Sequence, residues 1–249
     1  MAIVIKSPQE IAQMRQAGRI VAEVLTKLME AVKPGITTEE LNGLVERELA
    51  KRGAIPSFMG YRGFPASICT SINEEVVHGI PGPRHLKEGD LLSVDVGAIY
   101  QGFQGDAAVT VGVGAIDESA QRLIEVTKGA LGAGIAAARQ GARLGDVSAA
   151  IQGYVESHGF SVVREYVGHG IGREMHEEPQ IPNFGQAGQG PWLQKGMTLA
   201  LEPMVNAGGW KTKVADDGWT VVTADGSLSA HFEHTIAISD GGAEILTQL

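Results

Sequence analysis

The feature that most constrains this chain of 249 residues is an internal repeat. When the sequence is shifted by 106 residues, glycines and apolar residues of the first half fall on similar residues of the second half. The matched pairs are Gly35 with Gly141, Leu41 with Val147, Val45 with Ile151, and Gly53 with Gly159. In each half these positions predict a helix, a glycine-containing turn, a shorter helix and a closing glycine. The repeat indicates two halves related by duplication.

The repeat continues into predicted strands and ends on acidic residues. With a shift of 107 residues, residues 86–89 fall on 193–196, and Asp95 falls on Glu202. If the second half carries an insertion, Asp106 falls on Glu233. We therefore expect an α+β fold of one domain, 1–249, with two related halves at roughly 10–113 and 117–240, packed about one shared site.

Local signals place the helices and strands. Ser7 to Glu10 form a capping box with proline at the first helical position, and the helix that follows should end before Pro34. Thr37 and Glu40 repeat this chemistry for a second helix, closed by Gly53. The other expected elements are two strands within 91–113 and helices at about 117–140 and 145–158, followed by strand-like sequence.

Composition excludes several classes of protein. Hydrophobic residues make up 43% of the chain and charged residues 20%, as in ordinary globular proteins. A net charge of -9 without a basic run argues against nucleic acid as a partner. No stretch approaches the roughly 20 apolar residues that span a membrane, and the N-terminus lacks the apolar core of a signal peptide. One cysteine, Cys69, can form no internal disulfide, which fits a cytoplasmic location.

Two carboxylates lie in the predicted strand pair. With a turn near Tyr100, an antiparallel hairpin would place Asp95 and Asp106 directly opposite each other, with Cβ atoms about 5 Å apart. Both side chains would point to one face, while Val94 and Val96 take the other. Carboxylates this close repel each other, and one is protonated unless a cation lies between them. This pair alone is equally consistent with a solvent-exposed acidic hairpin.

The second half favours the cation. Glu202 and Glu233 each lie in mostly apolar strands, where an unpaired carboxylate is costly. His169 lies between glycines, which let the backbone approach a site closely. Four acids and one imidazole suit two divalent ions about 3.5–4 Å apart that share a water. A mostly oxygen site with one nitrogen indicates manganese, iron(II) or cobalt more than structural zinc.

Five motifs resemble those of the methionine aminopeptidases, in their bacterial type I form within peptidase family M24. In order they are SINEEVVHGIP (71–81), SVDVGAIYQGFQGD (93–106), GHGIGREMHEEPQIPNF (168–184), MTLALEPM (197–204) and DGWTVVTADGSLSAHFEHT (217–235). The resemblance covers nearly the whole chain. It implies the duplicated "pita-bread" fold around a central antiparallel sheet with a dinuclear metal site. The short spacing from Glu202 to Glu233 leaves no room for the helical insertion of type II enzymes, and no zinc-binding N-terminal extension is present.

The resemblance implies a role for each of the five ligands. Asp106 and Glu233 would bridge two metal ions of cobalt, manganese, iron(II) or zinc. Asp95 would hold one ion, and His169 and Glu202 the other. The resemblance also implies a separate site for a monovalent cation, sodium or potassium. Asn73 and Ser229 match positions of the family that contribute to it.

Catalytic and substrate-binding roles follow from the same resemblance. Glu202 would be the acid/base partner of the attacking water, His176 would donate to the oxyanion, and His78 would bind the substrate near the scissile peptide. The expected methionine pocket consists of Tyr61, Phe64, Cys69, Trp219, Phe58 and Met175. Positions 58 and 175 depart from the family pattern, which more often has cysteine and phenylalanine there. No role is assigned to His85, His158, His231 or His234.

The expected activity is hydrolysis of the N-terminal initiator methionine from nascent proteins whose second residue is small. The enzyme would act as a monomeric cytoplasmic protein, with the ribosome as a candidate partner. One alternative is an Xaa-Pro aminopeptidase or prolidase, which shares the five ligands but usually carries an additional N-terminal domain. Another is a non-catalytic peptide-binding member of the fold, although such relatives typically lose several ligands.

Overall fold

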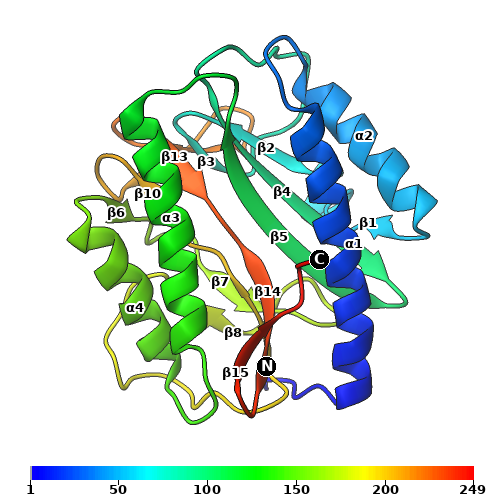
Figure 1. Ribbon diagram of the computed structural model, residues 1–249, viewed down its shortest axis with the longest axis vertical. Helices are drawn as coiled ribbons and strands as arrows, with labels where there is room; N and C mark the ends of the chain where they lie inside the picture. The colour runs from blue at the N-terminus through cyan, green and yellow to red at the C-terminus, as the bar shows by residue number, and fades with distance from the viewer. Residues whose placement is uncertain (1) are drawn as a thin grey trace.

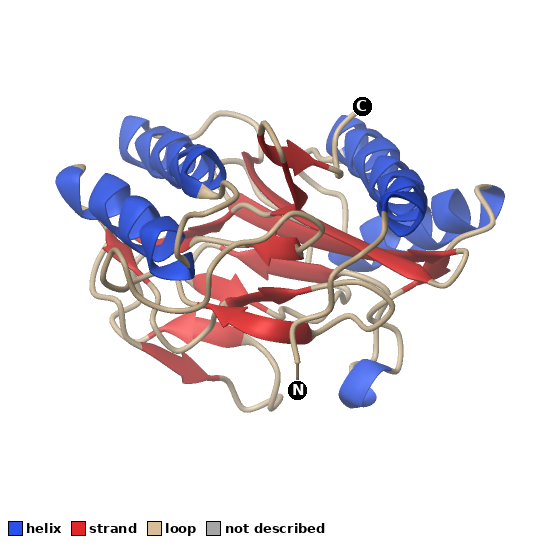
Figure 2. Ribbon diagram, turned by 90° about the horizontal axis from the view of Figure 1, so that it is seen from below, coloured by secondary structure: helices blue, strands red, loops and turns tan. Residues whose placement is uncertain are grey.

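Four long helices cover one face of a layer of strands in the computed structural model, which describes residues 2–249 (Figures 1 and 2). The first half contributes α1 (Pro8–Ala31) and α2 (Thr38–Lys51), and the second half contributes α3 (Glu118–Ala137) and α4 (Leu144–Ser157). A short 3₁₀ helix, η1 (Tyr61–Gly63), follows the first pair. No helix within residues 2–249 is long and apolar enough to cross a membrane.

The predicted capping boxes begin both helices of the first half. The Ser7 hydroxyl accepts from the Glu10 amide, and the Glu10 carboxylate accepts from the Ser7 amide at 2.9 Å. Thr37 and Glu40 make the same reciprocal contacts at the start of α2. These contacts satisfy amides that have no partner within the helix. The helix signals in this half are therefore confirmed.

The two halves show the same helix and turn geometry. Helices α2 and α4 begin and end at positions that differ by 106 residues. The turn before each helix carries the same backbone hydrogen bond, from Gly35 to the Leu86 oxygen at 2.8 Å and from Gly141 to the Leu193 oxygen at 2.9 Å. Equivalent local structure at equivalent positions supports the duplication, while the proposed bounds of the halves stay a prediction.

The strands form two larger and two smaller sheets. In the first sheet, β4 pairs with β1 and β2 along one edge and with β5 along the other. The second has the order β15-β14-β9-β7-β8, and the smaller sheets have the orders β13-β10-β6 and β11-β12-β3. The strands are β1 (Ile55–Pro56), β2 (Cys69–Ile72), β3 (Glu75–Val77), β4 (Leu91–Tyr100), β5 (Phe103–Gly112), β6 (Ser161–Val162), β7 (Gly168–Gly170), β8 (Glu177–Ile181), β9 (Thr198–Leu201), β10 (Met204–Asn206), β11 (Thr212–Val214), β12 (Val221–Thr223), β13 (Ser229–His231), β14 (His234–Ser239) and β15 (Gly242–Ile245).

The two halves meet where β5 runs beside the start of β14 (Figure 1). The Glu233 amide donates to the Ala108 oxygen at 2.9 Å, and the Ala108 amide donates back at 3.3 Å. The Thr235 hydroxyl donates to the Asp106 oxygen at 2.8 Å. Reciprocal bonds of this kind mark an antiparallel pair, so β4, β5, β14, β9 and β7 lie side by side across both halves.

The register of the β4–β5 hairpin differs from the predicted one. Asp95 pairs with Ala108, and Asp106 pairs with Gly97, so the prediction that the two aspartates lie directly opposite each other was wrong by two residues. The cause is the turn, which consists of Gln101 and a glycine after it, both with positive φ, rather than Tyr100 and Gln101. A shift of two residues keeps both carboxylates on one face, because side chains alternate with period two.

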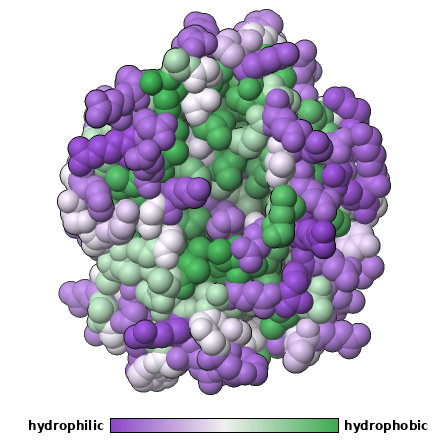
Figure 3. Space-filling model, in the orientation of Figure 1, coloured by the Kyte–Doolittle hydropathy of each residue, from purple (hydrophilic) through white to green (hydrophobic). Residues whose placement is uncertain are grey.

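Each helix pair packs on the apolar face of its own half. The buried Val94 and Val96 of β4 pack in one cluster with Val21 of α1 and Val45 of α2. Helices α3 and α4 pack in the same way on the apolar residues of β9 and β14. Fully burying such side chains contributes about 1.5–3 kcal/mol each. The space-filling view shows polar residues on the flanks of this face and apolar residues along its middle (Figure 3). The opposite face of β4 and β5 is thereby left to the carboxylates.

Candidate metal centre

Side chains from both halves line one cavity of about 150 Å³ at the junction of the sheets. Asp95 lies within β4 and Asp106 within β5, whereas His169 is the middle residue of β7. Glu202 directly follows β9, and Glu233 directly precedes β14. The structure thus brings together all five residues that the sequence predicts as metal ligands.

Strand pairing explains why these side chains share one face. Ala108 pairs with Asp95 on one side and with Glu233 on the other, so the two acids flank the same residue of β5. On the next strands, His169 pairs with Ala200, which lies two residues before Glu202. Residues two apart on a strand point to the same face. The five side chains therefore converge through backbone pairing.

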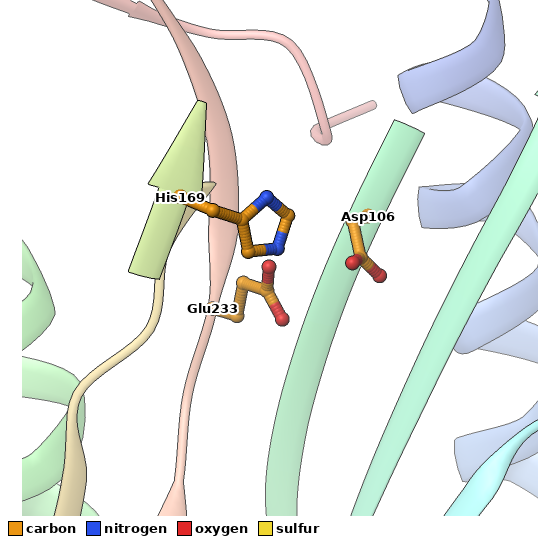
Figure 4. A group of neighbouring side chains, drawn as sticks. All are labelled: Asp106, His169 and Glu233. Carbon is orange, nitrogen blue, oxygen red and sulfur yellow. The ribbon is translucent and has the colours of Figure 1, made fainter. Parts of the chain in front are cut away.

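The central group is compact and buried (Figure 4). Asp106, His169 and Glu233 offer ligand atoms that all lie within 4.8 Å of one another, and their side chains point toward a common space. The Nε2 atom of His169 also lies 3.5 Å from Oε1 of Glu202. These spacings suit ligands that share a cation.

Unpartnered oxygens support that interpretation. Among residues 2–249, the buried atoms without a hydrogen-bond partner include Oδ1 of Asp95, Oδ1 of Asp106 and Oε1 of Glu233. A buried polar atom without a partner costs about 1–3 kcal/mol, and more when it is charged. Three such oxygens at one place fit hard divalent cations, which bind carboxylates.

The electrostatics of the centre lead to the same conclusion. Burial raises the pKa of Asp95 to about 7. Burial, followed by repulsion from neighbouring carboxylates, raises the pKa of Asp106, Glu202 and Glu233 well above the ordinary range. Each proton that these groups retain would be released to solvent when a divalent cation binds, because the cation compensates the negative charge.

His169 is held as a neutral imidazole. Burial lowers the pKa of its imidazole to about 4. Its Nδ1 lies 2.9 Å from the Gly170 oxygen, so Nδ1–H donates there and the Nε2 lone pair faces the carboxylates. A backbone acceptor on one ring nitrogen is the usual way in which a protein orients the other nitrogen toward a metal.

His176 lies at the exposed rim of the cavity, against Tyr61. Its Nδ1 is 2.8 Å from the Tyr61 hydroxyl, and the two rings stack with centroids 5.3 Å apart. Burial of the inner edge, together with His169 and Arg62, lowers the pKa of His176, which keeps the ring neutral. When the Tyr61 hydroxyl donates to Nδ1, the Nε2 atom carries the hydrogen and can donate to substrate.

His78 approaches the cavity from another segment. Its backbone has a φ of 60°, an unusual value for a residue other than glycine, and its ring packs edge-on against Tyr166 at 5.8 Å. Burial lowers its pKa. The ring is therefore held in place as a neutral hydrogen-bonding group.

The remaining wall of the cavity is largely apolar. Phe64 and Trp219 meet edge to face at 5.2 Å, and Cys69 lies nearby as a neutral thiol, since burial and Asp95 raise its pKa. The five predicted pocket residues that line the cavity are Phe58, Tyr61, Phe64, Cys69 and Trp219. Met175 does not line it. The Met175 side chain is buried beside Gly97 together with Phe58, so any effect on the pocket would pass through Phe58.

The predicted monovalent-cation residues lie together. The Ser229 amide donates to the Asn73 oxygen at 2.9 Å. Their side chains are used within the protein, since Asn73 donates to Asp90 and Ser229 donates to Asn206. The monovalent cation at this place stays a prediction.

Two cavity neighbours had no assigned role in the sequence. Arg62 lines the cavity from η1 with a φ of 51°, and no periodicity could have indicated this. His231 is 2% exposed, and its Nε2 lies 3.8 Å from Oε2 of Glu202. A signal did exist for His231, because it stands two residues before Glu233 in a strand-like segment, and such residues share a face.

Fold and site together define a metallopeptidase. The model of metallopeptidase family M24 matches residues 12–240, and the chain belongs to this family. Within the family it groups with the bacterial methionine aminopeptidases. It is 58% identical over 246 residues to the methionine aminopeptidase of Clostridium acetobutylicum, covering 98% of each chain. It is 55% identical over 247 residues to methionine aminopeptidase 1 of Bacillus subtilis, covering 99% of this chain and 100% of that one.

Solved structures confirm the predicted fold. The methionine aminopeptidase of Thermotoga maritima superposes with a TM-score of 0.98 at 53% identity, over 100% of both chains. The prolidase of Pyrococcus furiosus, at 22% identity, has a TM-score of 0.80 over 99% of this chain and 66% of its own. At that identity the prolidase shows a shared fold alone. The duplicated pita-bread fold is therefore common to both kinds of enzyme, and the sequence relatives do not favour the prolidase alternative.

Proposed function

We propose that this enzyme hydrolyses the N-terminal methionine from peptides and nascent proteins whose second residue is small. The observation that carries the proposal is the junction of two surfaces in one cavity. Five side chains suited to metal binding line the cavity together with an apolar wall that includes Phe64 and Trp219. The apolar wall suits the methionine side chain, and the carboxylates suit cations beside its scissile peptide.

The donor set fits two divalent cations of cobalt, manganese, iron(II) or zinc. Asp95, Asp106, His169, Glu202 and Glu233 would hold them. When bound there, such ions lower the pKa of a water to near 7 and polarise the scissile carbonyl.

The chain's own residues then complete the reaction. The Glu202 carboxylate, whose pKa is raised by burial, takes the proton from the attacking water and passes it to the leaving amine. The Nε2–H of His176 donates to the oxyanion, which lies on the side of the cavity next to Tyr61. His78 donates to the substrate peptide and holds it in place.

The physiological setting extends the same proposal. The substrates would be nascent chains, with the ribosome as a docking partner of the enzyme. The enzyme would act in the cytoplasm as a monomer. The second residue would be restricted to small side chains by the crowded rim formed by His176 and Tyr61.

The test is methionine release from a Met-Ala-Ser peptide by metal-stripped protein, with and without manganese, iron(II) or cobalt. A Met-Leu-Ser peptide checks the second position, and an Ala-Pro-Ala peptide checks the prolidase alternative. Metal-dependent release from Met-Ala-Ser alone is the expected result. Comparable release from Met-Leu-Ser would contradict the size restriction, and cleavage of the proline peptide alone would contradict the whole proposal.

A further inference from the structure

His231 points an unpartnered nitrogen into the metal centre. The side chain is 2% exposed, and within residues 2–249 its Nε2 atom has no hydrogen-bond partner. This atom lies 3.8 Å from Oε2 of Glu202 and 3.9 Å from Oε2 of Glu233. The three ligand atoms of Glu202, His231 and Glu233 all lie within 4.8 Å of one another.

The backbone fixes this ring in place. The His231 amide donates to the Thr110 hydroxyl at 2.8 Å, and that hydroxyl lies 2.8 Å from the His231 oxygen. Strand β13 also pairs His231 with Met204 of β10. Because Thr110 lies on β5, the strand that carries Asp106, these contacts fix the His231 backbone against the strand of a predicted ligand.

The spacing fits shared coordination better than a hydrogen bond. A nitrogen that donates to a carboxylate lies about 2.7–3.2 Å from the oxygen. Nitrogen and oxygen ligands lie about 2.0–2.2 Å from one cation, so two of them can be separated by as much as about 4.2 Å. Both distances from His231 exceed the first range and fall within the second.

The Glu202 carboxylate lies near two imidazoles. Glu202 turns Oε1 toward His169 and Oε2 toward His231. Glu233 belongs to the group of Asp106 and His169 and also to the group of Glu202 and His231. The carboxylate pair is therefore flanked by one imidazole on each side.

We propose that His231 is a sixth metal ligand of this enzyme, which binds a divalent cation together with the carboxylates of Glu202 and Glu233. The inference rests on the proposed metal centre and adds a second nitrogen donor to it. The centre then has two ligand groups, Asp106–His169–Glu233 and Glu202–His231–Glu233, each with one imidazole. Two nitrogen donors favour iron(II), cobalt and zinc over manganese and magnesium, which prefer oxygen ligands.

The test uses the full-length protein, stripped of metal and titrated with cobalt(II). H231Q removes the imidazole but keeps a polar side chain of similar length. H234Q is the matched control, because His234 contacts the Thr247 hydroxyl and is absent from both ligand groups. X-ray absorption counts the imidazoles per bound cobalt, and calorimetry measures the affinity of each equivalent.

In the fully loaded protein, H231Q should halve the number of imidazoles per cobalt and weaken one of the two equivalents by more than about 100-fold, beyond the 10–100-fold typical of outer-shell partners. H234Q should behave as the wild type. An unchanged imidazole count in H231Q would overturn the proposal and leave His231 as a neighbour that does not bind metal.

A measurement on the wild type covers the case in which H231Q does not fold. In protein with ¹⁵N-labelled histidine, zinc should shift the Nε2 resonances of two buried rings, His169 and His231. A shift of one buried ring alone would overturn the proposal. Methionine release by the same wild-type samples reports on the proposed function separately, so failure of one inference is distinguishable from failure of the other.

Discussion

The two halves of the molecule position their acidic residues with strands of different length and continuity. In the first half, β4 and β5 are ten residues each and are joined by a two-residue turn, so the ladder from Leu91 to Gly112 is continuous. In the second half, the strands that follow the repeat, β9 and β14, have four and six residues. Residues 202–233 separate them and contain β10, β11, β12 and β13.

The position of that interruption is informative. Glu202 is the first residue after β9, and Glu233 is the last before β14, so both acids lie where the ladder opens. The first half places its acids within a continuous hairpin, whereas the second half uses the opening to bring Trp219 to the cavity and His231 beside Glu202. Both halves therefore supply two carboxylates each, and the opening in the second half adds Trp219 to a wall that otherwise comes from the first half.

The largest effect is expected at the hairpin, from Asp106→Asn. Loss of a ligand that both proposed cations share should lower kcat/KM by more than about 100-fold, above the range typical of outer-shell partners. The metal-free variant should unfold at a higher temperature than metal-free wild type at pH 8. In the metal-free wild type the folded-state pKa of Asp106 lies above its unfolded value, so the ionised carboxylate lowers stability as pH rises. Asparagine carries no charge and removes that loss of stability.

Peptide assays and thermal unfolding of stripped protein check this prediction, with Asp216→Asn as the control at an exposed acid of the second half. Equal stability of the two metal-free proteins at pH 8 would show that Asp106 is not under electrostatic strain.

The next effect concerns His176, which the second half supplies. His176→Ala should lower kcat by about 100- to 1,000-fold, the range for loss of one oxyanion donor. Cobalt binding should stay unchanged, because His176 contacts Tyr61 and is absent from both ligand groups. His158→Ala, at the end of α4, is the control. A fall in cobalt affinity as large as the fall in kcat would assign His176 to the metal centre instead.

The third effect concerns Trp219, which residues 202–233 contribute to the apolar wall. Trp219→Ala removes the edge contact with Phe64 and widens the cavity. We expect kcat/KM for Met-Ala-Ser to fall by about 10- to 200-fold, the usual worth of apolar contacts in a specificity pocket. Discrimination against Leu-Ala-Ser should fall as well. Steady-state kinetics on the two peptides measure both effects, and unchanged discrimination would place the methionine side chain elsewhere.

A smaller effect concerns the free space around one glycine in each half of the molecule. In α1, a Cβ at Gly18 would lie 2.3 Å from the Leu246 backbone oxygen, so Gly18→Ala should destabilise the protein by about 1–3 kcal/mol. In α3, Gly132 has nothing within 4 Å, and Gly132→Ala should stabilise it by about 0.5–1 kcal/mol. Denaturant unfolding measures both, and changes of the same sign would show that the space around the added methyl group does not decide the effect at these two positions.

The smallest effect lies at the ends of the equivalent helices α2 and α4. Lys51 and Arg52 lower the pKa of Glu48 to about 2, whereas the equivalent position of the second half is Tyr154. Because the folded pKa lies below the unfolded value, this contribution is present above about pH 4.5 and is lost as pH falls toward 2. Glu48→Gln should therefore lower the melting temperature slightly at pH 7 and not at pH 2.

Salt should weaken the effect of Glu48, because the pair is close to solvent. Tyr154→Phe is the control in the second half and should show no dependence on pH over this range. A Glu48→Gln effect of equal size at pH 7 and pH 2 would contradict the ion-pair explanation.

Much of the fold was predictable because its signals are local. A capping box joins residues three apart, so Ser7 and Glu10 identify the start of a helix without any tertiary contact. Strand alternation likewise indicated that Asp95 and Asp106 share a face. The register of the two strands depended on which two residues form the turn. The turn lies one residue later than predicted, and Asp95 therefore pairs with Ala108, two residues after Asp106.

The sequence predicted which five side chains belong to the candidate metal centre, and it did not predict how they come together. The internal repeat, the apolar context and the family motifs identified four acidic residues and one histidine in the sequence itself. Only the pairing of Ala108 with Glu233 placed the two halves in contact, and only the fold of the insertion brought His231 beside Glu202. Backbone pairing between distant strands leaves no periodic trace in the sequence, whereas helix caps and strand alternation do. The sequence by itself determined the helices, the strand alternation and the residue types of the site, and tertiary structure decided which distant side chains lie together around one cavity.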